Sequence, residues 1–125
     1  MQTIILFMLR QAVAQGLIHR LEGISDVRVF YEGDYSKAEG LINPNAADIA
    51  LIEVAETGVY DVLYCLDLCT RLRKTIPSCK LILLCPEQDE ADVSAIVEAK
   101  QKGNIEDFIF YDASLDYLVF KLIST

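Results

Sequence analysis

The sequence predicts a single three-layer α/β sandwich, in which helices cover both faces of a five-stranded parallel sheet of strand order 2-1-3-4-5. Short apolar runs alternate with amphipathic stretches of helical length five times along the chain. Strands separated by helices pair in parallel through right-handed crossovers. The composition agrees, because 125 residues with 53% hydrophobic and 24% charged side chains suit one soluble domain over residues 1–125.

The first two predicted strands flank an amphipathic helix. Residues 3–8 (TIILFM) form an apolar run rich in β-branched side chains, which is typical of a strand buried on both faces. Gly23 ends the helix that follows. Residues 26–31 (DVRVFY) alternate in part, as a strand at the edge of a sheet does. The apolar face of the helix consists of Val13, Leu17, Ile18 and Leu21.

The third predicted strand ends in a carboxylate. A short helix is predicted within residues 35–42, before Asn43-Pro44, and residues 47–53 (ADIALIE) then form a nearly continuous apolar run. This run stops at Glu53. In an open α/β sheet, ligands bind at the edge formed by the carboxyl ends of the strands, so Glu53 is a candidate functional residue.

Two further strands and three helices complete the predicted sandwich. Helices are predicted within residues 59–76 and after the N-cap residues Asp89 and Ser114. Residues 80–85 (KLILLC) and 107–111 (DFIFY) form the fourth and fifth strands. The inward helix faces are Val59, Val62, Leu63, Leu66, Cys69 and Leu72, then Val93, Ile96 and Val97, and finally Leu115, Leu118, Val119 and Leu122.

The charge of the chain disfavours nucleic acid as a partner. The formal net charge is −8, whereas phosphate contacts need clustered Lys and Arg. The basic cluster Arg71, Arg73 and Lys74 ends a predicted helix, where cations interact favourably with the helix dipole. The apolar N-terminal segment is too short to span a membrane and lacks the basic residues of a signal peptide, so we expect a cytoplasmic protein.

The four cysteines are expected to be buried and reduced. Cys65 and Cys69 have a C-x3-C spacing on a helix, but a zinc site would need further ligands, and His19 is distant in sequence. Cys85, at the end of a strand, is a candidate nucleophile of a cysteine enzyme. The acids of the following segment would raise the pKa of its thiol, which disfavours this alternative.

The predicted order of elements is that of the flavodoxin-like fold, and this fold allows a cofactor-binding function. A phosphate cradle after the first strand would need Gly, Ser or Thr residues that present backbone N–H groups. Residues 7–13 at this point read FMLRQAV and contain none of them. We therefore expect no cofactor and no metal.

Over nearly its whole length the chain resembles the receiver domain of response regulators, the phosphate-accepting module of two-component signalling. The resemblance rests on DIALIE, on CLDLCTRLRKTIPSCKLILLC and on QKGNIEDFIFYD. These segments are similar to the family's third strand, to its helix, proline and strand, and to its turn into the fifth strand. The resemblance implies a receiver-type, flavodoxin-like sandwich and a signalling function rather than an enzymatic one.

None of the family's reactive residues is retained at the matching positions of this sequence. The position of the aspartate that accepts phosphate falls on Glu53, which alone retains the charge. The acid pair that helps to hold Mg²⁺ falls on Met8 and Leu9, or on Leu9 and Arg10 if the register shifts by one. The positions of Ser/Thr, of Lys and of a switching aromatic fall on Cys85, Tyr111 and Phe108.

These replacements predict a pseudo-receiver, which is a receiver-like domain that is not phosphorylated. Mg²⁺ prefers oxygen ligands, which Met8 and Leu9 lack, and Arg10 would repel the ion. Glu53 is one methylene longer than Asp, and a displacement of about 1 Å can cost on the order of a hundredfold in rate. Without the Lys, the developing phosphoryl charge also lacks a cation. The alternatives are a receiver that accepts phosphate atypically on Glu53 and the flavodoxin-like cofactor binder.

Three roles are open for Glu53. Its charge could mimic the phosphorylated state, it could pair with Arg10 across the metal pocket, or it could be a solvated acid without a role. Glu32, Asp34 and Glu56 follow neighbouring strands and could rebuild a metal site. The first two are expected about one strand spacing too far from Glu53.

We expect the domain to act by binding other proteins within a two-component or phosphorelay system. Cys85 is a weak hydrogen-bond donor in place of the family's hydroxyl, so a fixed conformation is favoured over a two-state switch. The family's usual dimer surface would consist of the helix at 89–103, the strand at 107–111 and the last helix. The short last helix suggests a piece of a longer signalling protein with an output or kinase region. Candidate interface anchors are Tyr111, Tyr117 and Phe120.

Overall fold

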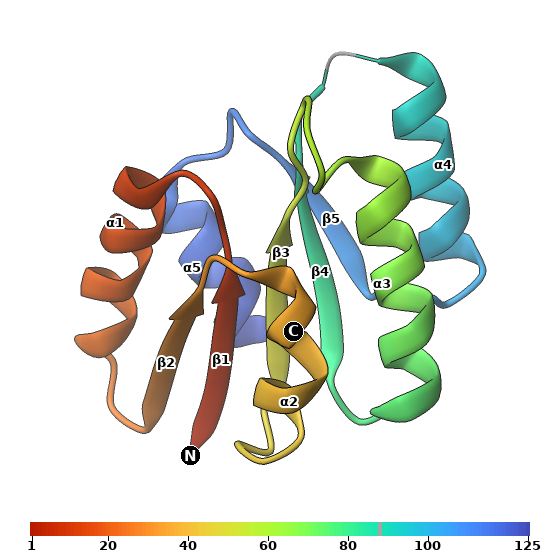
Figure 1. Ribbon diagram of the computed structural model, residues 1–125. Coiled ribbons are helices and arrows are strands. Elements are labelled where there is room, and N and C mark those ends of the chain that lie inside the picture. The colour runs from red at the N-terminus through yellow and green to blue at the C-terminus, as the bar shows by residue number, and fades with distance from the viewer. Residues whose placement is uncertain (88) are drawn as a thin grey trace.

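The computed structural model describes residues 1–87 and 89–125 and has a five-stranded parallel sheet of order β2-β1-β3-β4-β5 (Figure 1). The strands are β1 (Gln2–Phe7), β2 (Val27–Glu32), β3 (Ile49–Glu53), β4 (Lys80–Cys85) and β5 (Asp107–Phe110). The helices are α1 (Gln11–Glu22), the 3-10 turn η1 (Tyr35–Lys37), α2 (Ala38–Ile42), α3 (Val62–Thr75), α4 (Glu90–Gln101) and α5 (Leu115–Ser124). The predicted fold class and strand order are confirmed.

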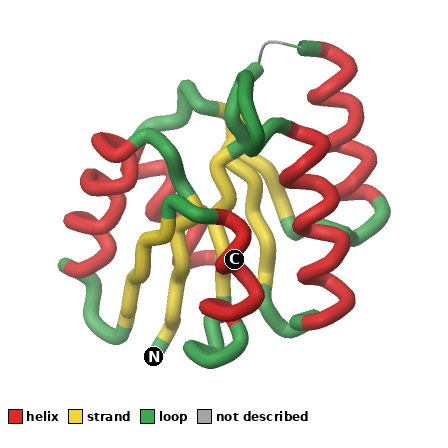
Figure 2. Tube along the Cα trace, viewed as in Figure 1, coloured by secondary structure: helices red, strands yellow, loops and turns green. Residues whose placement is uncertain are grey.

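Two hydrophobic cores lie between the sheet and the helices, one on each face of the sheet. Helices α1 and α5 cover one face, and α2, α3 and α4 cover the other (Figures 1 and 2). Alternate side chains of β1 enter opposite cores, so that Ile5 and Phe7 pack with α3 whereas Ile4 and Leu6 pack with α1. All five residues of β3 are buried. The central position of β3 explains why its sequence is an almost unbroken apolar run.

The helix predicted within residues 59–76 begins later than its apolar pattern indicates, at Val62. The Asp61 carboxylate accepts a backbone N–H of the first turn at 3.0 Å, and this cap sets the start of α3. Val59 and Leu63 were predicted to face inward, and that prediction is wrong because they are 74% and 77% exposed. The buried face consists of Val62, Cys65, Leu68, Cys69 and Leu72.

The predicted N-caps of the last two helices are confirmed. Asp89 and Ser114 each accept a backbone N–H from the first turn that they precede, at 2.8 Å and 3.1 Å. One carboxylate then joins α4, β5 and α5, because Lys100 and Lys121 lie 3.0 Å and 2.5 Å from the oxygens of Asp107. Burial opposes ionisation of Asp107, but the hydrogen bonds from the two lysines outweigh burial and lower its pKa.

Candidate functional site

Glu53 lies at the carboxyl edge of the sheet, where the ends of four strands meet. It pairs in register with Leu84 of β4, and Met8, Cys85 and Tyr111 stand at or just beyond the ends of the other strands. Glu53 is only 1% exposed. Of the three roles left open for Glu53, that of a solvated acid is therefore wrong. A buried carboxylate is stable in its ionised form only when it is paired and hydrogen-bonded.

Three donors from one short segment meet the Glu53 carboxylate. Its Oε1 accepts the backbone N–H groups of Leu9 at 2.8 Å and of Arg10 at 3.0 Å. Its Oε2 accepts the side-chain Nε–H of Arg10 at 2.5 Å. Arg10 is also the N-cap residue of α1, so the carboxylate faces the positive end of a helix dipole. The structure thus contains the contact between Arg10 and Glu53 that the second role requires.

Tyr111 holds the Arg10 guanidinium from the other side. Arg10 Cζ lies 3.8 Å from the centroid of the Tyr111 ring, within the range of a cation–π interaction. The Tyr111 hydroxyl donates a hydrogen bond to the Val54 carbonyl oxygen. Burial, and next the charge of Glu53, raise the pKa of Tyr111, so it is a neutral donor. Tyr111, which the resemblance matches to the family's lysine, therefore positions Arg10, a cation from the β1–α1 loop.

The main chain of Glu53 is held by Tyr35, which sequence reasoning missed. The Tyr35 hydroxyl donates to the Glu53 carbonyl oxygen at 2.6 Å. The Tyr35 ring is fully buried and stacks on Tyr60, with ring centroids 4.0 Å apart and planes 4° apart. The available signal was the presence of a tyrosine in each of two short loop-like segments, DYSK and TGVYD. No periodicity in either segment indicates that they pack together.

The side chains around Glu53 do not fit Mg²⁺, the ion implied by the receiver fold. This ion requires oxygen ligands in near-octahedral geometry. Met8 is buried and apolar, and Leu9 contributes only its backbone N–H group, which is a donor. The Arg10 guanidinium already occupies Oε2 of Glu53 and repels a second cation. We therefore assign no chemical step to a metal ion here.

The other acids do not rebuild a metal site. The Glu32 carboxylate accepts the backbone N–H of Asp34 at 2.9 Å, and Asp34 in turn caps η1 by accepting the N–H of Ser36 at 3.0 Å. Among residues 1–87 and 89–125, no group of three or more His, Cys, Asp or Glu side chains could hold a metal ion. Glu56 is exposed in the loop after β3.

The cysteines are buried and free, as predicted. Burial raises the pKa of Cys85 to about 12, which is the opposite of what a nucleophilic thiol needs. The predicted direction of the pKa shift of Cys85 is correct, but its main cause is desolvation by burial rather than the neighbouring acids. Cys85 Sγ lies 3.6 Å from the Ile109 carbonyl oxygen, so its weak donor is used within the sheet.

The remaining candidates separate into two locations. Tyr111 was grouped with the interface anchors, but its ring and hydroxyl contact Arg10 and Val54. Tyr117 and Phe120 lie on α5 and are 47% and 60% exposed. Phe108, the last candidate, lies on β5 and is half-buried against the core under α3 and α4.

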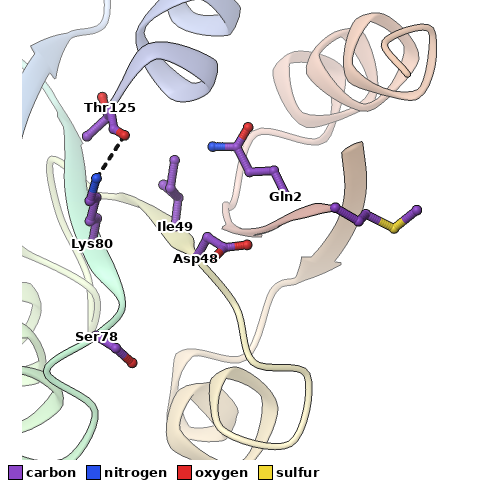
Figure 3. A pocket seen from close by; sticks show the side chains of 7 residues that line it. Gln2, Asp48, Ile49, Ser78, Lys80 and Thr125 are labelled. Atoms are coloured by element: carbon purple, nitrogen blue, oxygen red, sulfur yellow. Dashed lines mark hydrogen bonds between the residues drawn. The ribbon is translucent and has the colours of Figure 1, made fainter. Parts of the chain in front are cut away.

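A pocket at the opposite, amino-terminal edge of the sheet offers no further site (Figure 3). Of the side chains that line it, those of Asp48 and Lys80 are charged. The Asp48 carboxylate accepts the backbone N–H of Thr3 at 2.8 Å, and Lys80 Nζ donates to a backbone oxygen of Thr125 at 3.0 Å. Both groups thus have partners within the chain. In the described part of the chain, no helix combines the length and apolarity needed to cross a bilayer.

Comparisons with known proteins identify the fold. No protein-family model and no curated protein sequence matches the chain. A LuxR-family DNA-binding response regulator from Silicibacter pomeroyi is 20% identical with a TM-score of 0.75, over 98% of this chain and 89% of that chain. An orphan response regulator of H. pylori is 13% identical with a TM-score of 0.79, over 98% and 94%. A CheY-like receiver domain protein from Methanospirillum hungatei is 13% identical with a TM-score of 0.78, over 99% and 92%. The chain therefore has the fold of response-regulator receiver domains.

Proposed function

We propose that this chain is a receiver-like module of a cytoplasmic two-component or phosphorelay system that works without phosphorylation, by binding other proteins. One observation carries the proposal. Both carboxylate oxygens of Glu53, the residue that we match to the phosphate acceptor of the receiver family, accept hydrogen bonds from the β1–α1 loop. In this proposal the domain is not an enzyme and does not bind nucleic acid.

Phosphoryl transfer to Glu53 would have to disrupt this arrangement first. The reaction needs an accessible carboxylate oxygen in line with the donor, and cations that neutralise the transferring group. The Glu53 side chain is only 2% exposed, and its nearest cation, Arg10, is bonded to it. Hydrogen bonds to charged groups contribute roughly 1.5–3 kcal/mol each. Breaking them adds to the barrier before any bond to phosphorus forms.

The same contacts support a single fixed conformation. Arg10 joins the end of β3 to the start of α1, and Tyr111 joins the loop after β3 to the end of β5. A phosphorylated carboxylate would carry more negative charge than Glu53, whereas the guanidinium neutralises Glu53. We therefore favour a structural pair over mimicry of the phosphorylated state. A domain built in this way signals by being present and bound to its partner.

A spectroscopic titration tests this function. We expect the amide NMR signals of Leu9, Glu53, Cys85 and Phe108 to stay unchanged when Mg²⁺ and beryllofluoride, a stand-in for an acyl phosphate, are added to the folded protein. Incubation with acetyl phosphate should likewise add no phosphoryl mass. Glu53→Gln is the matched control, because shifts common to both proteins are not caused by the carboxylate. Saturable shifts that occur only with Glu53 present would overturn the proposal.

The α4–β5–α5 face is the surface that we propose for a homodimer. Tyr117, Phe120 and Ile123 recur at helical spacing on α5 and are 47%, 60% and 40% exposed. Aromatic residues on an exposed helix face are enriched at protein interfaces. An output or kinase region in a longer protein is the other partner that we propose.

The dimer proposal predicts a concentration-dependent sedimentation coefficient that Phe120→Ser reduces to the monomer value. Stability should change by no more than about 0.5 kcal/mol, because the side chain is largely exposed. Leu63→Ser, on a different face, should leave the dimer intact. A monomer at all accessible concentrations, or a dimer that Phe120→Ser leaves unchanged, would contradict this part of the proposal.

A further inference from the structure

A second exposed apolar surface lies at the start of α3. Val59, in the loop after β3, and Leu63, in the first turn of α3, are 74% and 77% exposed. Of the large hydrophobic residues in the described ranges, only Met1 is as exposed. Single exposed apolar residues are common, but these two are only four positions apart in the sequence. The segments that carry them, the loop after β3 and the start of α3, lie at the carboxyl edge of the sheet (Figure 1).

The loop that carries Val59 is firmly held. The backbone N–H of Ala55 donates to the Tyr60 carbonyl oxygen at 2.7 Å and closes the loop. Gly58, at φ +94°, supplies the left-handed turn within it. The Tyr60 ring then stacks on the buried Tyr35. A side chain presented on a fixed backbone loses less conformational entropy when a partner binds it.

An acidic cluster begins on the same loop, because Glu56 lies three residues before Val59. Glu56, Asp89 and Asp92, with Pro86, line one hollow between the loop after β3 and the start of α4. None of the ion pairs formed by the described residues includes any of these three acids. Their negative potential extends over roughly a Debye length, about 8 Å at physiological salt. The surface therefore combines apolar side chains with unneutralised negative charge.

We propose that Val59 and Leu63, together with Glu56, Asp89 and Asp92, form a docking surface for a protein segment whose apolar side chains are flanked by Lys or Arg. Charge complementarity selects this occupant. A second copy of the chain would oppose the same acids to one another, which disfavours association through this face. The inference rests on the proposed function in one respect, because a module that signals without phosphorylation needs a surface that its partner recognises.

Selection from a phage-displayed random peptide library tests this surface. We expect the parent protein to enrich peptides in which apolar residues are flanked by Lys or Arg. Their affinity should fall at least about tenfold for Val59→Ser/Leu63→Ser, the factor that corresponds to about one apolar anchor residue. Phe30→Thr, which removes an exposed apolar side chain from the edge strand β2, should leave the affinity unchanged. Raising the salt concentration should weaken binding.

A charge variant provides a second, independent readout. Glu56→Gln/Asp92→Asn keeps the apolar pair and should reduce both the affinity and its salt dependence. Both sites are on the surface, and denaturation midpoints equal to the parent's would establish that each variant folds. No enrichment, enrichment of peptides without basic residues, or equal binding to Val59→Ser/Leu63→Ser would overturn the docking surface. Phosphate plays no part in this selection, so failure of the selection would overturn the docking surface but not the phosphorylation-independent function. Beryllofluoride shifts at Glu53 would overturn that function but not the docking surface.

Discussion

Replacement of Arg10 by alanine is expected to lower the free energy of unfolding by about 2–3 kcal/mol. The change leaves the Glu53 carboxylate buried without its cation, and removal of one partner of a fully buried ion pair costs about 3–5 kcal/mol. The expected loss is smaller here, because the Arg10 side chain is 39% exposed and the two backbone N–H donors to Glu53 remain. Urea denaturation followed by far-UV circular dichroism measures it, since the chain has no Trp.

A double-mutant cycle separates the pair from the packing of the Arg10 side chain. Glu53→Gln keeps an oxygen that can accept the two backbone N–H groups, but its NH₂ group then faces the guanidinium. We expect Arg10→Ala/Glu53→Gln to be more stable than Arg10→Ala, with a coupling energy of about 1–3 kcal/mol. Additive effects, or a change below about 0.5 kcal/mol for Arg10→Ala, would show that the pair does not stabilise the fold.

The Arg10 result also bears on the proposal that Glu53 does not accept phosphate. In receivers the acceptor needs cations that are free to meet the incoming phosphoryl group. Here Arg10 supplies the cation and Tyr111 orients it, but Arg10 is bonded to the carboxylate itself. The Glu53 side chain, one methylene longer than that of Asp, reaches the N–H groups of the β1–α1 loop. The substitutions at these positions thus fit one another as a structural unit.

The sequence was sufficient for the parts of the fold that have a periodic pattern. The run KLILLC predicted β4 with its observed bounds, and Asp89 and Ser114 marked the starts of α4 and α5. Because the strand ends were expected to meet at one edge of the sheet, pairing with Arg10 was one of the three roles considered for Glu53. The start of α3 was misplaced, because apolar spacing continued upstream of the Asp61 cap, and Val59 was consequently assigned to the core. Leu63 lies within α3 but on its exposed side, although it was assigned to the inward face.

The contact of Tyr35 with Glu53 lay beyond sequence reasoning for a physical reason. The tyrosine is in a short 3-10 turn, and its stacking partner Tyr60 is 25 residues away in a loop. Neither segment has the period of a helix or a strand, so no local pattern indicates which way the rings point. Only the assembled sheet brings η1 next to the loop after β3, where the hydroxyl reaches the Glu53 carbonyl oxygen.

Tyr35→Ala is expected to be the most destabilising of the substitutions considered, at about 3–5 kcal/mol, because it removes a fully buried aromatic ring and leaves a cavity. Tyr35→Phe should cost about 1–2 kcal/mol, since it keeps the ring on Tyr60 but leaves the Glu53 carbonyl oxygen without its hydroxyl donor. Tyr117→Phe, on the exposed face of α5, is the matched control and should change stability by less than about 0.5 kcal/mol.

The phenylalanine variant also tests whether Tyr35 fixes the loop that presents Val59. If the hydroxyl holds the end of β3, its loss should shift the amide NMR signals of residues 54–61 and speed their hydrogen exchange, while signals of α5 stay in place. A loss of stability with unchanged signals in residues 54–61 would show that Tyr35 only fills the core. In that case the loop geometry would rest on the other contacts of Tyr60, which are the Ala55–Tyr60 hydrogen bond, the ring stacking and the hydrogen bond from the Tyr35 backbone N–H to the Tyr60 hydroxyl.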